Sequence, residues 1–343
     1  MRGERGAAGA RGPVLTSSHL DRLHAAAIAH AAALGDDGAG WLLDHGLLAV
    51  AGHADLPAAL RPPLADRVRR NAARNLLLVH RFRKLAAALA EAGVPVAPLK
   101  GLRLLATTYA SDPENRVLAD LDLLIPAARA EAAVARLADL GYRETDASRR
   151  AARRRHERVL GDGELTVELH TSLAAGLGRR GGWEALAPTP GRLHDCDCHL
   201  LDDSTHLAHL CLHFTRHGPF SELRWAEDLL REAAAADDAG ERLLDGAARL
   251  GTKRATVAAV EALRALVGRD LLPAVPRRLG GLAGTALAIT FAGPWRGMRR
   301  RPFAAGAAIG PWRRTAASVL LADRPADALR AIAGKLTEIA ARS

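Results

Sequence analysis

The sequence predicts an α+β fold in which a small mixed β-sheet lies between two helical segments. Short runs that alternate polar and apolar residues, as strands do, are confined to residues 93–200. On both sides of this stretch, apolar residues recur with the period of amphipathic helices. We therefore expect a disordered arm at 1–15, a helical segment at 16–92, a sheet-containing core at 93–200 and a helical domain at 201–343.

The N-terminal segment is expected to contain three helices. His19–Leu34 and Trp41–Ala51 are separated by a Gly-Asp-Asp-Gly turn. A third, long helix ends at Gly93 and leads into the first strand, because apolar residues keep a helical period at Leu64, Val68, Leu76, Val79, Phe82 and Leu89.

The first strand of the core is expected at Val94-Pro95-Val96, followed by a turn at Lys100-Gly101. A glycine lets backbone N–H groups approach a phosphate at the start of a helix, here expected at Leu102–Tyr109. Lys100 offers a compact positive charge for phosphate, and lysine occurs at only four positions of this arginine-rich chain. The alternative is a chance placement on a solvated turn.

Asp120 and Asp122 form an Asp-x-Asp pair on the expected strand Leu118–Ile125. Successive side chains of a strand point to opposite faces, so both carboxylates share one face. Like charges this close repel unless a cation bridges them, and Mg²⁺, or Mn²⁺ in its place, prefers carboxylate oxygens. The alternative, two polar residues on an exposed edge strand, is less favoured because Asp is depleted in strands.

A third acid lies on a hairpin that follows an Ala-rich helix expected at Ala127–Leu140. The strands Arg158–Leu160 and Glu164–His170 are joined through Gly161-Asp162-Gly163, a strong hairpin signal. Alternation puts Glu168 and His170 on one face of the second strand. Three carboxylates on neighbouring strands can hold two metal ions around a transferring phosphate.

These motifs together resemble a known family. The Leu99–Gly101 turn, Arg116 a few residues ahead of the acid pair, and the strand Val167–His170 look like the uncharacterised bacterial nucleotidyltransferases of the polymerase-beta-like superfamily. The similarity extends to His206–His213 and Leu223–Asp228. Most members of the wider superfamily carry Gly-Ser or Gly-Gly at the triphosphate loop, whereas this chain has a Lys-Gly pair.

The resemblance implies a nucleotidyltransferase core and Mg²⁺-dependent transfer of a nucleoside monophosphate from an NTP to an acceptor, with release of pyrophosphate. Asp120 and Asp122 would hold Mg²⁺, and Glu168 would complete a second metal position and help to deprotonate the acceptor. The active cleft is expected between the sheet and the C-terminal helices.

The remaining site residues are expected to contact the substrates. Lys100 and Gly101 would hold the β- and γ-phosphates, and His170 would shape the acceptor side. Arg116 would balance the developing charge, or else pair with Asp120 or Asp122.

The acceptor is expected to be a small molecule, a peptide or a protein. The formal net charge of +10 suits anionic partners from a triphosphate to RNA. However, the basic clusters at Arg149–Arg158, Arg299–Arg301 and Arg313–Arg314 lack interleaved aromatic residues, so a nucleic acid is not favoured. The alternatives to an enzyme are a nucleotide-binding, antitoxin-like module and a non-catalytic helical interaction protein.

A cytoplasmic location without membrane contact is expected. Met1–Val14 lacks the apolar run of a signal peptide, and the longest apolar run, Leu282–Trp295, is interrupted by glycine and proline. The three cysteines make no disulfide framework.

The His- and Cys-rich stretch 194–213 does not have the paired spacing of a structural zinc site. His206, His209 and His213 instead line one face of an expected helix, which either borders the nucleotide cleft or is packed. Helices are expected at 204–217, 221–236, 240–250 and 253–267, and shorter helices and loops in the proline-containing remainder.

Overall fold

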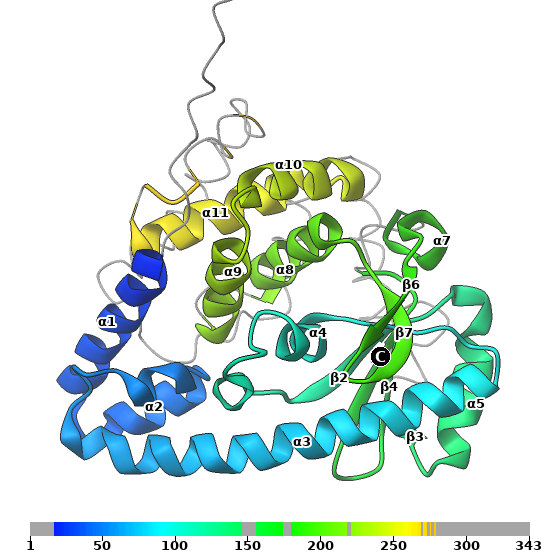
Figure 1. The fold of residues 1–343 in the computed structure, drawn as a ribbon, viewed down its shortest axis with the longest axis horizontal. Helices are drawn as coiled ribbons and strands as arrows, with labels where there is room; N and C mark the ends of the chain where they lie inside the picture. Colours follow the sequence, from blue (N-terminus) through cyan, green and yellow to red (C-terminus); the bar gives the residue numbers. More distant parts are fainter. Residues whose placement is uncertain are drawn as a thin grey trace, which may run out of the picture.

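The computed structural model describes residues 17–145, 156–173, 180–217, 221–268, 270–272, 275 and 278. A mixed sheet and a small hairpin lie among helices, which confirms the α+β fold class (Figure 1). The expected arm at 1–15, the arginines of 149–155 and the proline-containing remainder beyond residue 278 lie outside the described residues.

Most helices occupy the predicted parts of the chain, but α7 was not predicted, and the helix expected at Trp41–Ala51 ends at Asp44 and is followed by a separate 3-10 turn. Those before and within the core are α1 (Ser17–Ala33), α2 (Gly38–Asp44), α3 (Arg61–Glu91), α4 (Lys100–Ala106), α5 (Ala130–Asp139) and α7 (Trp183–Leu186). Those after it are α8 (Asp203–His217), α9 (Arg224–Ala234), α10 (Ala239–Leu250) and α11 (Lys253–Val267). Short 3-10 turns lie at 35–37, 48–52, 58–60, 113–115 and 127–129.

The main sheet has the order β1-β2-β5-β4-β3. Its strands are β1 (Ala97–Pro98), β2 (Asp120–Leu124), β3 (Arg143–Glu144), β4 (Glu157–Gly161) and β5 (Thr166–His170). Strands β4 and β5 form the expected hairpin, whereas β2 and β5 run parallel. The parallel pairing places Asp122 directly opposite Glu168.

One face of the sheet is apolar and packs against α3 and α5. Leu121, Leu123, Val167 and Leu169 are fully buried there, in one cluster with residues of both helices. Truncating any of these leucines to Ala would cost about 2–5 kcal/mol, because the cavity left behind refills only in part. The opposite face carries the acids and lies toward α8, because Leu124 packs with residues of that helix.

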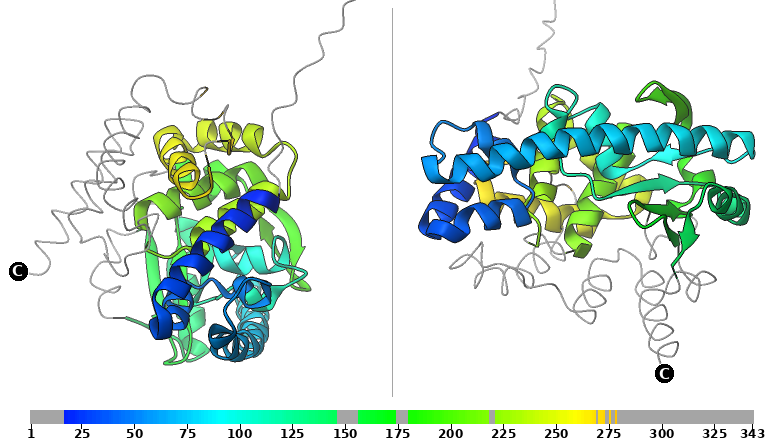
Figure 2. Two further views of the ribbon diagram at one scale, coloured as in Figure 1. Left: turned by 90° about the vertical axis from the view of Figure 1, so that its left-hand side faces the viewer. Right: turned by 90° about the horizontal axis from the view of Figure 1, so that it is seen from below.

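Helix α3 connects the N-terminal helices to the sheet and extends along the length of the described part (Figure 2, right). Its first half, at Leu64, packs with α1 and α2, and its second half, from Leu78 onward, packs under the sheet. One helix therefore contributes to two cores, and the domain boundary expected at residue 93 stays a prediction.

Two expected boundaries around the first strand are wrong by a few residues. The strand is Ala97–Pro98 rather than Val94–Val96, because the residues before it still complete the end of α3 through a hydrogen bond from Val94 N to Leu89 O. Helix α4 begins at Lys100, two residues earlier than expected, and ends at Ala106.

A second hairpin, which the sequence analysis missed, accounts for the Cys-rich stretch. Strands β6 (Thr189–Leu193) and β7 (Cys196–Leu200) pair antiparallel. Their two-residue turn, His194-Asp195, has positive φ values of 50° and 56°, as a hairpin turn that matches the twist of its strands requires. His199 N donates to Val96 O, which joins this hairpin to the main sheet.

The C-terminal helices bury α8. A Cβ atom at Gly246 of α10 would lie 2.0 Å from Ser204 O, so only glycine permits this close approach of α10 to α8. None of the described helices is long and apolar enough to span a membrane.

Candidate active site

The polar face of the sheet brings the predicted acids together. Asp122 is 5% exposed, and Asp120, two residues earlier on β2, is partly exposed. Glu168 lies beside Asp122 on the neighbouring strand β5. The arrangement follows from the strand period, which sends the alternate leucines into the core. Three carboxylates therefore share one small area.

Two cationic side chains contact the central acid. Lys100 Nζ lies 2.6 Å from Asp122 Oδ1, and His170 Nε2 lies 2.8 Å from the same oxygen. His170 Nε2 also lies 3.5 Å from Glu168 Oε2. Lys100 reaches Asp122 from a backbone with a φ of 48°, and the preceding residue, Leu99, donates its N–H to Asp122 O at 3.0 Å.

The electrostatics of the three acids differ. Burial by itself would raise the pKa of Asp122, but Lys100 and His170 outweigh it and hold that pKa well below its usual range. Burial and the negative charges of Asp122 and Glu168 raise the pKa of Asp120 to about 6. Among the described residues, Asp120 has no ion-pair partner, so the site holds more negative charge than its contacts balance.

The pKa values of the two cationic side chains, Lys100 and His170, are raised. Burial disfavours their charged forms, but the adjacent carboxylates outweigh it. Hydrogen bonds to Asp122 and Glu168 raise the pKa of His170 to about 9, and the charge of Asp122 raises the pKa of Lys100. Both groups are therefore positively charged at neutral pH.

Gly101 is closely packed. A Cβ atom on this residue would lie 2.6 Å from Leu118 Cδ1 and 3.4 Å from Arg116 Nη2. A side chain there would require the end of the Leu118 side chain, or the loop, to shift. The sequence analysis predicted a phosphate approach at this glycine, and the tight contact with Leu118 is a second, structural reason for its identity.

Arg116 lies beside Gly101 but pairs with an acid that the sequence analysis did not expect. Its Nε donates to Asp228 Oδ1 of α9 at 2.7 Å, and both side chains are buried. The expected pairing with Asp120 or Asp122 is therefore wrong. A role in phosphate binding stays a prediction.

Sequence reasoning gave no role to Arg224, Glu227 or Asp228, although they lie in the segment that carries the family resemblance. Arg224 lies at the start of α9. Its positive charge lowers the pKa of Asp120, against the larger effects of burial, Asp122 and Glu168, so Arg224 lies within electrostatic reach of the site. The adjacent acids Glu227 and Asp228 in the first turns of this amphipathic helix could have indicated a functional or structural role. At least one of two neighbouring acids is expected on the buried side of such a helix, where it requires a cationic partner.

The histidines of α8 are packed. Burial lowers the pKa of His206 and His209, which keeps both rings neutral. Neither belongs to a group of side chains that can hold a metal ion, as far as the described residues show. The charges of Lys100 and His170 also depress the pKa of His209, so this face of α8 borders the acid site.

The acid site has the donors that a divalent cation needs. Asp122, Glu168 and His170 offer ligand atoms that all lie within 4.8 Å of one another, and Asp120 adds a further carboxylate at the edge. The oxygen-rich set suits Mg²⁺ or Mn²⁺. Burial, and after it the negative charges of Asp122 and Glu168, raise the pKa of Asp120, and a bound cation would relieve the repulsion between these charges.

A comparison with known protein families matches residues 40–268 to a family described as uncharacterised nucleotidyltransferases. The matched part runs from α2 to the end of α11 and contains every described strand together with all the predicted site residues. A search of curated proteins found no match.

Proposed function

The chain belongs to the nucleotidyltransferase family that it matches over residues 40–268, and we propose that it transfers a nucleoside monophosphate from an NTP to an acceptor. One observation carries the proposal: Asp120, Asp122 and Glu168 converge on the polar face of two parallel strands with more negative charge than the protein balances. Such an arrangement favours a divalent cation and the phosphates that accompany it.

Asp120, Asp122 and Glu168 would hold Mg²⁺, or Mn²⁺, at this face. The bound metal supplies Lewis-acid stabilisation of the charge that develops on the transferring phosphoryl group. Contacts with Lys100 Nζ and His170 Nε2 hold the carboxylate of Asp122 in one orientation for metal binding. A carboxylate held in one orientation costs little to reorganise during the reaction.

The reaction joins an acceptor oxygen or nitrogen to the α-phosphorus and breaks the bond from that phosphorus to the β-phosphate oxygen. Pyrophosphate leaves with the electron pair of the broken bond, and the acceptor proton goes to a base. Glu168 suits this step because it is the more exposed of the two paired carboxylates, at 24% for its side chain against 6% for Asp122. His170 contacts Glu168 and would position it toward the acceptor.

Lys100, Gly101 and Arg116 would hold the β- and γ-phosphates. Lys100 Nζ donates a hydrogen bond to Asp122, so the ammonium group is already positioned to bind a triphosphate beside Asp122. Arg116 Nη2 lies against Gly101, while its Nε holds Asp228. One guanidinium can therefore serve both the buried acid and an anion at the loop.

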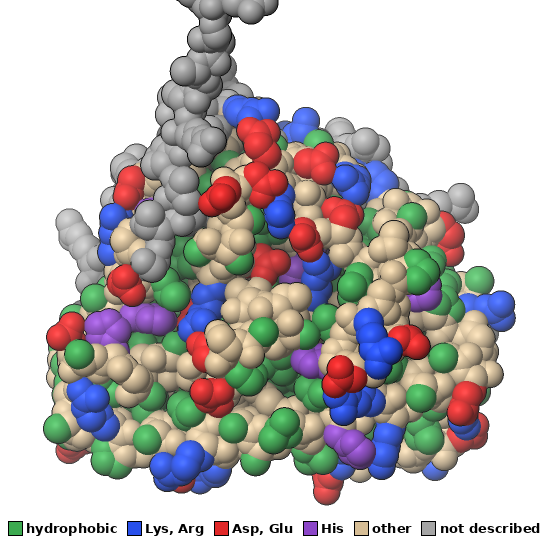
Figure 3. Space-filling view, viewed as in Figure 1, with side chains coloured by type: hydrophobic (Ala, Val, Ile, Leu, Met, Phe, Trp, Pro, Cys, Tyr) green, Lys and Arg blue, Asp and Glu red, His purple; other side chains and the backbone are tan. Residues whose placement is uncertain are grey.

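We favour a small molecule, a peptide or a protein as acceptor over a nucleic acid. On the face shown in Figure 3, basic and acidic side chains are interspersed rather than gathered into a basic stripe. Arg158, the described member of the basic cluster expected at 149–158, is buried and pairs with Glu131 and Glu144.

The reaction with an NTP also favours a cytoplasmic location.

The test is incubation of the full chain with Mg²⁺, each of the four α-labelled NTPs and a cell extract. We expect release of pyrophosphate and transfer of label to a product whose size separates metabolite, protein and RNA acceptors. Asp120→Asn should abolish both signals, and Asp112→Asn, which changes an acid paired with Arg231, should keep them. Mg²⁺-dependent NTP binding without pyrophosphate release would support the antitoxin-like module, and no NTP binding would support a non-catalytic interaction protein.

A further inference from the structure

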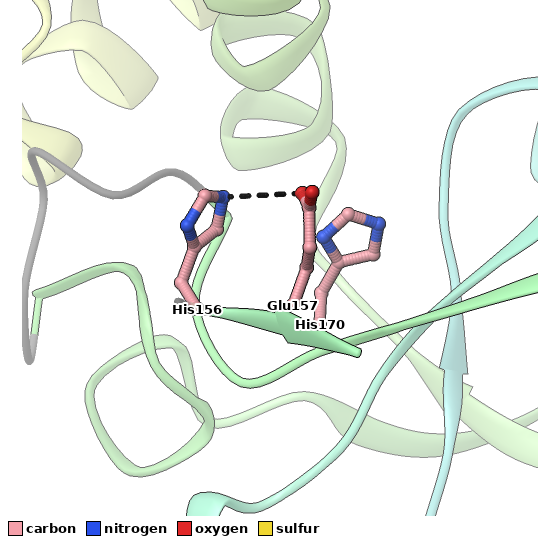
Figure 4. Close-up of side chains that lie close together, drawn as sticks. All are labelled: His156, Glu157 and His170. Carbon is pink, nitrogen blue, oxygen red and sulfur yellow. Dashed lines mark ion pairs between the residues drawn. The ribbon is translucent and has the colours of Figure 1, made fainter. Parts of the chain in front are cut away.

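A second group of potential metal ligands lies next to the acid site. His156 and Glu157, at the start of β4, and His170, at the end of β5, bring one ligand atom each to within 4.8 Å of the others (Figure 4). This group contains two imidazoles and one carboxylate, whereas the acid site is made mainly of carboxylates. The two groups share His170.

The hairpin register places these side chains together. Glu157 pairs directly with His170 across the antiparallel strands, so their side chains share a face. His156 precedes the strand at a bend, and its side chain stands on the same side as that of Glu157 in Figure 4. Thr171 N donates to His156 O at 2.7 Å, which ties the bend to the end of β5.

The orientation of His170 makes one ring nitrogen available. The ring places Nε2 2.8 Å from Asp122 Oδ1, where the imidazole N–H donates to the carboxylate oxygen. Its other nitrogen, Nδ1, is buried without a hydrogen-bond partner, and the side chain is 4% exposed. A buried nitrogen without a partner is costly unless a ligand occupies it.

The contact between Asp122 and His170 is of the kind that supports metal-bound histidines in other proteins. A carboxylate that accepts the proton of one ring nitrogen fixes the tautomer and makes the other nitrogen a better ligand. His156 Nε2 and Glu157 Oε2 are 3.6 Å apart, close to the separation of about 3.4 Å that a tetrahedral zinc site gives its ligands.

We propose that His156, Glu157 and His170 form a binding site for one divalent transition-metal ion of the zinc class. Two imidazoles and a carboxylate bind Zn²⁺, Co²⁺ or Ni²⁺ in preference to Mg²⁺. His170 contributes Nδ1, whose proton the ion displaces into solvent, and stays connected through Nε2 to Asp122. The ion would therefore hold His170, and through it Asp122, in place. The site does not depend on the proposed nucleotidyl transfer.

The test is a titration of the untagged, chelator-treated full chain with Co²⁺, followed by the visible absorption of tetrahedral cobalt. We expect one equivalent to bind, Zn²⁺ to displace it, and excess Mg²⁺ to leave it in place. His156→Ala and Glu157→Gln should each weaken binding by at least about 100-fold, since even the loss of a supporting residue costs about 10–100-fold.

His53→Ala is the matched control. His53 lies 3.7 Å from an acid, Asp55, and its side chain is 26% exposed against 18% for His156. It is therefore a similar His–acid pair, and no third ligand joins it among the described residues. Its loss should leave Co²⁺ binding unchanged. Glu157→Gln keeps the side-chain volume, so it tests the site even if His156→Ala folds poorly by circular dichroism.

Three results would overturn the proposal. No cobalt band in the folded wild-type chain would show that the site does not bind this class of metal. Binding that survives both His156→Ala and Glu157→Gln would assign the ion to Asp122, Glu168 and His170 instead. Displacement by excess Mg²⁺ would lead to the same conclusion.

Discussion

Two clusters of acidic side chains in this protein differ in how their charge is balanced. On α9, Glu227 and Asp228 are both almost fully buried. Asp228 accepts hydrogen bonds from Arg116 Nε at 2.7 Å and Tyr109 OH at 3.0 Å, and Glu227 accepts one from Arg231 Nε at 2.9 Å. Each acid of this α9 cluster therefore contacts an arginine, although Arg231 also pairs with Asp112.

On the sheet, Asp120, Asp122 and Glu168 share two cations, Lys100 and His170, and both cations contact the same oxygen of Asp122. Asp120 has no ion-pair partner among the described residues, and its pKa is raised to about 6 by burial and by the other two acids. Burial alone therefore does not distinguish the clusters, whereas the excess of negative charge does. Removing one partner from a balanced buried cluster leaves an uncompensated charge and destabilises the fold, whereas an unbalanced cluster favours a bound cation, as the proposed function requires.

The largest expected effect is on catalysis. Asp120→Asn removes an unpaired carboxylate, so turnover should fall by about 10⁴-fold, equivalent to about 5 kcal/mol of transition-state stabilisation, with little change in thermal stability. Pyrophosphate release and differential scanning calorimetry measure the two quantities. A variant that keeps wild-type turnover would show that the unbalanced charge has no catalytic role.

The next effect is on stability. Asp228→Asn leaves the buried guanidinium of Arg116 without its carboxylate, and the free energy of unfolding should fall by about 3–5 kcal/mol. Asp112→Asn, which neutralises a partner of Arg231 whose side chain is 25% exposed, should cost at most about 1 kcal/mol. Urea unfolding measures both, and equal losses in the two variants would contradict the comparison.

A smaller effect should come from ligand binding. With Mg²⁺ and a non-hydrolysable NTP at about 100 times their dissociation constants, the native state should gain about 2.7 kcal/mol, or about 5–10 °C in melting temperature. Asp120→Asn should remove this shift. If the shift survives in that variant, the nucleotide binds away from the sheet cluster.

The smallest effect concerns acid stability near the start of α9. Burial lowers the pKa of His45 from 6.5 to about 4, and its Nδ1 accepts a hydrogen bond from Leu223 N. The unfolded chain takes up a proton more readily, so stability is present above pH 6.5 and is lost as the pH falls toward 4. His45→Gln should reduce this loss by about 1–3 kcal/mol in urea titrations at several pH values. His53→Gln, a change at a more exposed ring, should leave the loss unaltered.

Much of the sheet could be predicted because its signals are local. The period of two put Asp120 and Asp122 on one face and their leucine neighbours in the core, and the Asp-Gly turn predicted the β4–β5 hairpin. The β6–β7 hairpin was missed, although residues 196–200 alternate polar and less polar side chains after a two-residue turn. Strand β6 contains Pro190 and Gly191, two residue types that are depleted in strands, so its sequence does not indicate a strand.

The partners of the charged residues could not be predicted. Arg116 and Asp228 are 112 residues apart, and nothing in the spacing of either one indicates the other. The group formed by His156, Glu157 and His170 was equally hidden. Strand periodicity would send His156 and Glu157 to opposite faces, and only the bend before β4 brings them to one side.

The sequence by itself determined the α+β class, most of the helices and the faces of β2 and β5, because helix and strand periods act over a few neighbouring residues. Only the tertiary structure decided which acids are neutralised and which are not, since a carboxylate meets its cation across the fold and Coulomb attraction depends on distance in space. That decision separates Asp228, paired with Arg116, from Asp120, which has no ion-pair partner among the described residues.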